Sequence, residues 1–256
     1  MAKSISPLQQ LYFAWDLIHK KSVSDDTRFT GILSEAKVDL NPHQVEAALF
    51  AFKSPLSKGA ILADEVGLGK TIEAGIILSE MWAEHKRNIL IIVPASLRNQ
   101  WNIELMEKFF LPSTILLSDN YSAYKSAGVN PLGAGEDIIV CSYNFAAKYS
   151  EDISKVSWDL VVIDEAHKLR NVYRKSAKLS NILKRVLQPY KKVLLTATPL
   201  QNNLKELYGL ISIIDGEFFS SVDTFDRQYN AVSTRETSRY SELKERLQRI
   251  SHRTLR

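Results

Sequence analysis

One segment of eight residues constrains the fold of this chain more than any other: Asp64-Glu65-Val66-Gly67-Leu68-Gly69-Lys70-Thr71. It follows a short apolar run and precedes a helical pattern, as a phosphate-binding loop does. The glycines permit a tight turn that brings backbone N–H groups close to a phosphate, and the amino end of the next helix favours an anion. We therefore expect Lys70 to contact the β- and γ-phosphates of ATP and the Thr71 hydroxyl to bind Mg²⁺.

A second segment supplies the acidic groups that such a site needs. The apolar run Leu160–Ile163 ends in Asp164-Glu165-Ala166-His167. Ligands of parallel α/β folds bind at the carboxyl ends of the strands. We expect Asp164 to hold Mg²⁺ through water and Glu165 to orient and deprotonate the attacking water. His167 either relays between the nucleotide and the rest of the molecule or caps and packs locally.

Short apolar runs alternate with longer helical patterns, and this order predicts βαβ units with a parallel sheet. The runs are apolar throughout, as strands buried on both faces are. They are Ala60–Ala63, Ile89–Val93, Thr114–Leu117, Asp137–Cys141, Leu160–Ile163 and Val193–Leu195. The helical patterns are Thr71–His85, Ser96–Phe109, Ser176–Leu187 and Asn203–Ile214. The predicted fold class is α/β, with a mostly parallel sheet flanked by helices on both faces.

Local signals place further elements outside this alternation. Ser6-Pro7 and Asn41-Pro42 each begin a helix, the second with Gln44 in the capping-box position. Residues 119–135 contain three Gly and one Pro and predict a surface loop. Residues 241–256 show the pattern of a basic amphipathic helix.

Composition limits the class of protein. The chain has 256 residues, of which 45% are hydrophobic, so it can bury a core and does not belong to a disordered class. A single cysteine, Cys141, excludes an internal disulfide and a cysteine-based zinc cluster. Its place at the end of an apolar run predicts a buried core residue. No apolar run reaches the roughly 18 residues that a membrane span requires.

The charges are distributed unevenly along the chain. The net charge is only +4, but ten Lys or Arg and no acidic residue lie between Glu165 and Glu206. Such a block is either an electrostatic footprint for a polyanion or a solvated helix face. Charge alone does not choose between these interpretations.

Four segments and one unusual residue carry a resemblance to a known family. The segments are Asp164–His167 followed by Lys168-Leu169-Arg170-Asn171, the stretch Leu194–Leu207, Pro94-Ala95-Ser96-Leu97 with Trp101 and Glu104, and Cys141-Ser142-Tyr143. The residue is Asp64, where a generic phosphate loop has Gly. In their order and spacing along the chain, these residues resemble the Swi/Snf-type ATPases of helicase superfamily two. The resemblance covers about residues 40–256. Glu65-Val66-Gly67 and Thr196-Ala197-Thr198 are more similar to the bacterial, RapA-like branch.

The resemblance implies a RecA-like lobe of a P-loop NTPase, with ATP and Mg²⁺ as its ligands. It implies nucleotide contacts by His43, Gln44, Asp64 to Thr71 and His167, where Gln44 recognises adenine and can also cap its helix. It implies sequence-independent contacts to duplex DNA phosphates by Ser96, Ser142, Tyr143, Lys168 and Arg170. Thr196 and Thr198 would couple the two sites or form only a turn at the end of a strand. We expect Trp101 to support the core.

We expect the chain to divide into three parts. The local helix signal predicts a helical extension over residues 1–40. The resemblance implies the ATP-binding lobe over 41–235 and, over 236–256, the start of a helical segment that leads to a second RecA-like lobe, which we expect to be absent here. The second lobe supplies arginine fingers in this family. We therefore expect the lobe alone to be nearly inactive.

The function that the resemblance implies is DNA-dependent ATP hydrolysis that moves the protein along duplex DNA and remodels or displaces bound proteins. RNA polymerase or another DNA-bound protein is an expected partner, and the bacterial cytoplasm, at the nucleoid, the expected location. Two alternatives stay open: a stand-alone nucleotide-binding scaffold and a helicase that separates strands.

Overall fold

A computed structural model describes residues 41–53, 58–65, 67–198, 203–229 and 237–253. Within these ranges one sheet has the strand order β3-β4-β2-β5-β6-β1-β7, and all of its strand pairs are parallel. The strands are β1 (Gly59–Leu62), β2 (Ile89–Val93), β3 (Ser113–Leu116), β4 (Ile138–Ser142), β5 (Leu160–Asp164), β6 (Lys192–Leu195) and β7 (Ser251–His252).

Helices alternate with these strands along most of the chain. The α-helices are α3 (Pro42–Lys53), α4 (Lys70–Ala83), α5 (Arg98–Phe109), α6 (Ser118–Ser126), α7 (Tyr143–Lys148), α8 (Ser150–Ser154), α9 (Lys178–Leu187), α10 (Leu204–Ile214), α11 (Val222–Tyr229) and α12 (Thr237–Gln248). Two 3-10 helices, η1 (Ala95–Leu97) and η2 (Ala166–Leu169), follow β2 and β5.

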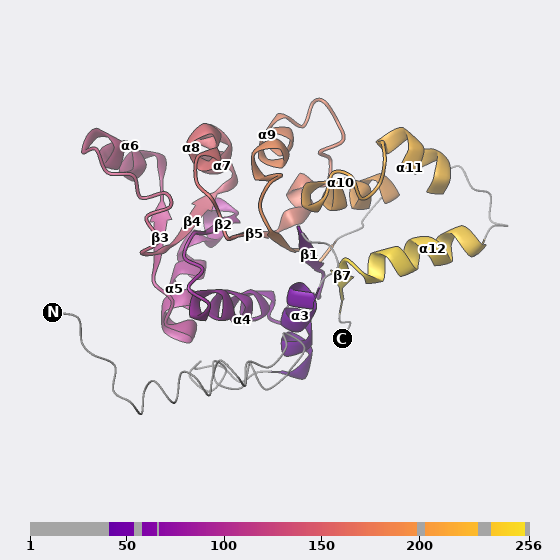
Figure 1. The fold of residues 1–256 in the computed structure, drawn as a ribbon, viewed down its shortest axis with the longest axis horizontal. Coiled ribbons are helices and arrows are strands. Elements are labelled where there is room, and N and C mark those ends of the chain that lie inside the picture. The colour runs from indigo at the N-terminus through magenta and orange to yellow at the C-terminus, as the bar shows by residue number, and fades with distance from the viewer. Residues whose placement is uncertain (1–40, 54–57, 66, 199–202, 230–236, 254–256) are drawn as a thin grey trace, which may run out of the picture.

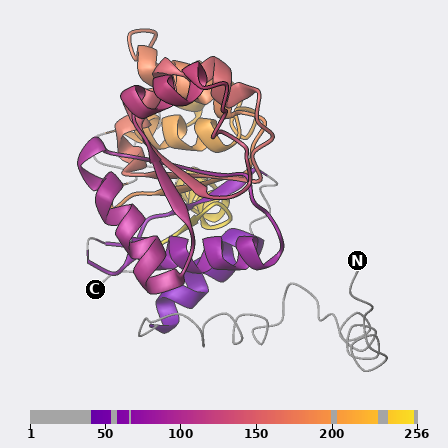
Figure 2. The same ribbon diagram turned by 90° about the vertical axis from the view of Figure 1, so that its left-hand side faces the viewer.

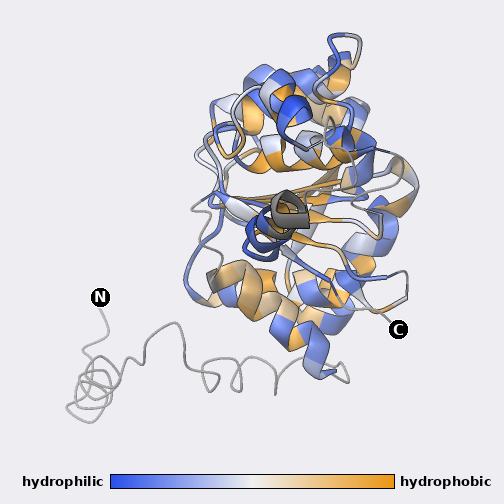
Figure 3. Cartoon of the chain, turned by 90° about the vertical axis from the view of Figure 1, so that its right-hand side faces the viewer, coloured by the Kyte–Doolittle hydropathy of each residue, from blue (hydrophilic) through white to orange (hydrophobic). Residues whose placement is uncertain are grey.

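The sheet lies between two layers of helices (Figures 1 and 2). Successive strand residues point to opposite faces, so Ile61 packs in the core beneath α7, α9 and α10, whereas Ala60 and Leu62 pack in the core beneath α3, α4 and α5. Figure 3 shows the hydrophobic colour concentrated on the strands and on the helix sides next to them. The predicted α/β class with helices on both faces is confirmed.

The strand register brings the ends of distant segments to one edge of the sheet. Leu62 of β1 lies beside Leu195 of β6, and Leu195 lies beside Asp164 of β5. On the other side of β5, Val93 of β2 lies beside Ser142 of β4. The loop that follows β1, the end of β5 and the starts of η1 and α7 therefore share this carboxyl edge.

The predicted elements agree closely with the structure. Each of the six predicted strands has both ends within one residue of the observed strand, and each of the four predicted helices has both ends within two residues. The helix predicted to begin at Pro42 is α3. Cys141 is fully buried and free, as its apolar context predicted, and burial raises the pKa of its thiol.

The prediction of a loop over residues 119–135 is wrong for its first part, which forms helix α6. The Asn120 side chain accepts a hydrogen bond from the Leu117 backbone N–H at 2.7 Å and so caps the helix start. Tyr121 is buried and packs edge-on against Phe145 and Tyr149. This aromatic burial outweighs the poor helix propensity of the Ser- and Asn-containing sequence.

The prediction of an amphipathic helix over residues 241–256 is wrong for its last part. Helix α12 ends at Gln248, and Ser251–His252 form β7 beside β1. The backbone N–H groups of Ile61 and Ala63 donate to the carbonyls of Ile250 and His252 at 2.8 and 2.7 Å. Buried edge groups of β1 need such partners, and this need ends the helix.

Some predictions fall on residues outside the described ranges. They are the extension over residues 1–40 with its Ser6-Pro7 helix, Val66, and Pro199–Asn202. Among the described residues, no helix has both the length and the apolar character that a membrane crossing needs.

Candidate functional site

The loop between β1 and α4 has the backbone of a phosphate-binding loop. Gly67 and Gly69 have φ of 86° and 92°, which residues with a Cβ rarely adopt. An added Cβ on Gly69 would also lie 2.3 Å from Gln44 Nε2, so both conformation and space require glycine there. The described part of the loop thus leads directly into the amino end of α4, where backbone N–H groups favour an anion.

Lys70 and Thr71 open α4 and line a cavity of about 380 Å³, which we call the phosphate-loop cavity. Its remaining lining comes from the loop, from α4, from β5 with the residue after it and from α5 with the residue before it: Gly67, Gly69, Ile72, Leu97, Gln100, Trp101, Glu104, Lys108, Asp164 and Glu165. The Lys70 ammonium donates to the carbonyls of Asp64 and Glu65 at 3.0 and 3.3 Å. The loop therefore holds this lysine at its own start.

Asp164 ends β5 at the floor of the same cavity and is held by two donors. The Trp101 indole N–H donates to Asp164 Oδ2 at 2.9 Å, and the Glu165 backbone N–H donates to Oδ1 at 2.8 Å. Burial raises the pKa of Asp164, while these two hydrogen bonds oppose the shift. Trp101 is buried, as predicted, but its role in orienting Asp164 was not predicted, since nothing in the local pattern indicates it.

Glu165 follows in a conformation that is rare for a residue other than glycine, with φ of 52°. The bend turns its side chain into the phosphate-loop cavity. His167 Nδ1 lies 3.1 Å from Glu165 Oε2, so the two side chains form a pair. His167 is thus connected to the site through Glu165, which keeps both of its predicted interpretations open.

The oxygen ligands of this cavity fit Mg²⁺. A hydroxyl from Thr71 and carboxylates from Asp164 and Glu165 line one space, and Mg²⁺ in phosphate sites takes one or two carboxylates while water and substrate phosphates complete its shell. Among the described residues, no three His, Cys, Asp or Glu side chains converge on a metal position. This donor set suits a metal ion that arrives with a triphosphate.

His43 and Gln44 contact the phosphate loop from α3. Gln44 Nε2 donates to the Leu68 carbonyl at 2.9 Å, and its Oε1 accepts from the Asn41 backbone N–H at 3.1 Å. His43 Nε2 lies 3.2 Å from the same Leu68 carbonyl. The helix-capping interpretation of Gln44 is therefore confirmed, and its recognition of adenine stays a prediction.

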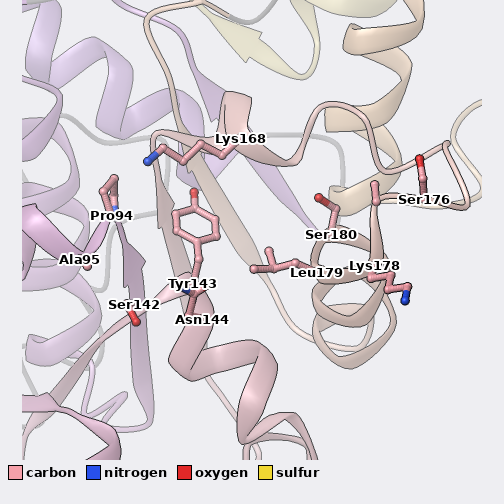
Figure 4. Close-up of a pocket in the computed structure, with 11 residues that line it drawn as sticks. Pro94, Ala95, Ser142, Tyr143, Asn144, Lys168, Ser176, Lys178, Leu179 and Ser180 are labelled. Atoms are coloured by element: carbon pink, nitrogen blue, oxygen red, sulfur yellow. The ribbon is translucent and has the colours of Figure 1, made fainter.

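A second, larger cavity of about 590 Å³ lies between η1, α7 and α9, and we call it the α7–α9 cavity. Its lining is Pro94, Ala95, Ser142, Tyr143, Asn144, Lys168 and residues 176–180. Figure 4 shows the Tyr143 ring and the Lys168 side chain beside Pro94, with Ser180 across from them and the Lys178 ammonium pointing away. The structure thus brings together three of the five predicted DNA contacts: Ser142, Tyr143 and Lys168.

The other two predicted DNA contacts do not line this cavity. Ser96 is exposed in η1, next to the lining residue Ala95. Arg170 extends toward α10, where its Nε lies 3.5 Å from Glu206 Oε1. Their contact with DNA stays a prediction.

The basic block between Glu165 and Glu206 is not one continuous surface. Lys192 is fully buried and donates to the carbonyls of Leu187, Gln188 and Tyr190 at 2.8, 3.3 and 2.6 Å, so it caps the carboxyl end of α9. Lys205 pairs with Asp226 at 2.9 Å. These two charges therefore serve local structure, and both interpretations stay open for the other residues of the block.

Thr196 and Thr198 follow β6 at the same edge of the sheet. The Thr196 hydroxyl accepts a hydrogen bond from the Thr198 backbone N–H at 3.2 Å, which is the turn expected at a strand end. The Thr196 backbone N–H donates to the Leu62 carbonyl at 3.0 Å, just before the phosphate loop. This contact is compatible with a coupling role, which stays a prediction.

Two buried acids behind the phosphate loop complete the site. Asp64 and Glu73 are fully buried, and burial together with the Asp64 charge raises the pKa of Glu73 to about 8. His252 Nδ1 of β7 lies 3.6 Å from Asp64 Oδ1. The sequence offered no signal for Glu73 or His252, because their meeting with Asp64 depends on the packing of α4 and β7 against the loop.

Comparisons with known proteins agree with this geometry. The sequence model of the SNF2-related domain matches residues 15–256. The chain is 39% identical over 192 residues to the uncharacterized ATP-dependent helicase YqhH of Bacillus subtilis, covering 73% of this chain and 31% of that protein. It is 32% identical over 194 residues to the RNA polymerase-associated protein RapA of Yersinia pseudotuberculosis, covering 74% of this chain and 20% of that protein.

Solved structures show the same fold. The Sulfolobus solfataricus SWI2/SNF2 ATPase core in complex with dsDNA matches with a TM-score of 0.72 and 24% identity, over 86% of this chain and 45% of that one. The core domain from the same organism matches with a TM-score of 0.69 and 24% identity, over 86% and 44%. This chain therefore spans less than half of the proteins that it resembles.

Proposed function

Because the chain belongs to the SNF2-related family, we propose that it is the ATP-binding lobe of a DNA-dependent ATPase that moves on duplex DNA and remodels or displaces bound proteins. The observation that carries the proposal is the phosphate-loop cavity, in which Lys70, Thr71, Asp164 and Glu165 meet. A stand-alone scaffold has no chemical need for all four.

Each of these side chains has a chemical role toward bound ATP. Lys70 leaves the Asp64 and Glu65 carbonyls and contacts the β- and γ-phosphates, while the N–H groups at the start of α4 bind phosphate oxygens. Thr71 would hold Mg²⁺ directly and Asp164 would hold it through water, and the ion would neutralise charge on the phosphates. Glu165 orients the attacking water and accepts its proton, and His167 positions Glu165.

The α7–α9 cavity is the proposed nucleic-acid surface of this lobe. The Ser142 hydroxyl and the Lys168 ammonium suit the phosphates of a duplex, and contacts to phosphates carry no sequence information. We therefore propose sequence-independent binding. Each phosphate contact contributes about 0.9 to the slope of log affinity against log salt.

From the relatives of this chain we propose three further features: a second lobe, a protein target and a location in the cell. A second lobe would supply the arginine that raises turnover by about 10³ to 10⁵, so the lobe alone would hydrolyse ATP very slowly. RNA polymerase or another DNA-bound protein would be its target, as the name of RapA suggests. The bacterial cytoplasm, at the nucleoid, would be its location.

The nucleotide site is tested by the binding of a fluorescent ATP analogue with Mg²⁺ to this chain. ATP hydrolysis, with and without duplex DNA, is measured in a protein that joins this chain to the second lobe. We expect Lys70→Ala to weaken binding about tenfold or more, because hydrogen bonds to charged groups contribute about 1.5–3 kcal/mol. We expect Glu165→Gln to bind nucleotide and to lose hydrolysis. A wild-type chain without nucleotide affinity, or a Lys70→Ala chain with unchanged affinity, contradicts the proposal.

The nucleic-acid surface is tested by salt titrations of duplex binding. We expect Lys168→Gln to lower the salt slope by about 1. Lys86→Gln is the matched control, because Lys86 is exposed just before β2, at the opposite edge of the sheet. Equal slopes in Lys168→Gln and the wild type place the DNA elsewhere.

The name of YqhH, an ATP-dependent helicase, favours strand separation as a second candidate function. A strand-displacement assay on a duplex with a single-stranded end distinguishes the two. Release of a labelled strand supports a helicase, whereas displacement of a DNA-bound protein without strand release supports a translocase. Both assays require the second lobe.

A further inference from the structure

Tyr143 lines the α7–α9 cavity and contacts a residue that lines the phosphate-loop cavity. It is the first residue of α7, directly after β4, and its ring lines the α7–α9 cavity next to Ser142 and Lys168 (Figure 4). Its hydroxyl donates a hydrogen bond to the backbone carbonyl of Asp164. One side chain therefore connects the proposed nucleic-acid surface with the residue that ends β5 in the phosphate-loop cavity.

Asp164 is held from two directions by aromatic donors on different elements. Tyr143 of α7 holds its backbone carbonyl, and Trp101 of α5 holds its carboxylate at 2.9 Å. The next residue, Glu165, has the left-handed conformation noted above, so the direction of its side chain depends on where the Asp164 carbonyl lies. A displacement of this carbonyl therefore reorients the Glu165 carboxylate.

The hydrogen bond from the Tyr143 hydroxyl to the Asp164 carbonyl is costly to break. Tyr143 is buried at the start of α7, and its hydroxyl is bonded to the Asp164 carbonyl. A buried hydroxyl that loses its partner is destabilised. When a phosphate enters beside the Tyr143 ring, the ring and the Asp164 carbonyl have to move together.

We propose that Tyr143 is a positioning residue that couples the two cavities: a nucleic-acid phosphate in the α7–α9 cavity sets the Tyr143 ring, and the ring sets Asp164 and Glu165. The inference rests on the proposed function and adds the route by which DNA acts on the nucleotide site. Because coupling between two binding sites is reciprocal, nucleotide changes the affinity for duplex by the same factor as duplex changes the affinity for nucleotide.

Tyr143→Phe keeps the ring and removes only the hydroxyl, so it tests this route. The first measurement is the dissociation constant of a fluorescent ATP analogue in the 256-residue chain, with and without saturating duplex DNA. We expect a wild-type ratio of about fivefold or more and a ratio near 1 in Tyr143→Phe. Tyr121→Phe is the matched control, because the buried Tyr121 also loses a hydroxyl bonded to an acid, Asp152, and neither of these two residues lines either cavity.

The second measurement needs no nucleotide. The indole N–H resonance of Trp101 reports on Asp164 through their hydrogen bond, whereas the Trp158 indole donates to the Ile153 carbonyl and serves as an internal reference. We expect duplex DNA to shift the Trp101 resonance in the wild type and in Tyr121→Phe but not in Tyr143→Phe. A wild type whose Trp101 resonance does not shift with duplex refutes the coupling, and this result does not depend on whether Tyr143→Phe folds.

The outcomes separate this inference from the proposed function. If the wild type binds nucleotide and duplex but shows neither a ratio above 1 nor a Trp101 shift, coupling is refuted and the proposed function stands. If Tyr143→Phe keeps both effects, Tyr143 is not the route. If the wild type binds neither ligand, the proposed function fails and the inference fails with it.

Discussion

Replacement of Glu73 by Gln should make this protein more stable at neutral pH, although it alters a fully buried residue of α4. The Glu73 carboxyl lies against the buried carboxyl of Asp64, and a hydrogen bond between the two requires a proton. Burial, reinforced by the nearby Asp64 charge, raises the pKa of Glu73 from 4.5 to about 8. At pH 7 the folded protein therefore keeps a proton on Glu73 that the unfolded chain has released.

The size and sign of the effect follow from these two pKa values. Below about pH 4.5 the group is protonated in both states and costs nothing. Between pH 4.5 and 8 the unfolded chain ionises first, so the free energy of unfolding falls as the pH rises. At about 1.4 kcal/mol per pH unit, the cost at pH 7 is about 3 kcal/mol. Gln has nearly the same volume and never ionises, so it avoids this cost.

Urea denaturation from about pH 5 to about pH 9.5, without nucleotide or Mg²⁺, measures the difference. We expect the stability advantage of Glu73→Gln to grow with pH and to level off above pH 8. Glu46→Gln, on the exposed side of α3, is the control and should show no such trend. A difference that stays constant across this range, or a Glu73→Gln protein that is less stable at pH 7, refutes the assignment of a neutral buried Glu73.

Three further substitutions test contacts that the structure assigns. Trp101→Phe removes the donor to Asp164, and we expect the half-saturating Mg²⁺ concentration for nucleotide binding to rise about tenfold, since such hydrogen bonds contribute about 1.5–3 kcal/mol. Lys192→Met leaves carbonyls at the end of α9 without their donor and should lower the free energy of unfolding by about 1–3 kcal/mol. Gly209→Ala places a Cβ 1.9 Å from the Arg170 carbonyl oxygen, so α10 and η2 must separate, at a cost of about 1–3 kcal/mol or more in urea denaturation.

Each of these tests has a result that contradicts it. An unchanged Mg²⁺ requirement in Trp101→Phe means that the indole does not orient Asp164. A Lys192→Met protein of wild-type stability means that the buried ammonium costs as much as its three hydrogen bonds contribute. Gly216→Ala is the control for Gly209→Ala, because its added Cβ meets nothing closer than 3.9 Å.

Local sequence patterns were sufficient to predict the helices and strands and the four central residues of the candidate site. The apolar runs and the Gly-Lys-Thr loop depend on short-range rules, namely burial of strands on both faces and glycine in left-handed turns. Those rules predicted the strands to within a residue and placed Lys70, Thr71, Asp164 and Glu165 at one edge. They failed where a distant partner decided the outcome, as at α6 and β7.

The partners of each functional group depended on tertiary packing. The sequence contains Trp101, Tyr143 and Asp164 but does not show that they are in contact. The contact arises because β2 and β4 bring α5 and α7 beside the end of β5. The raised pKa of Glu73 likewise follows from its burial on α4 beside Asp64 of the phosphate loop. Periodicity and turn chemistry act over a few neighbouring residues, whereas hydrogen-bond partners and desolvation are set by side chains far apart in the chain, and these exist only once the sheet is assembled.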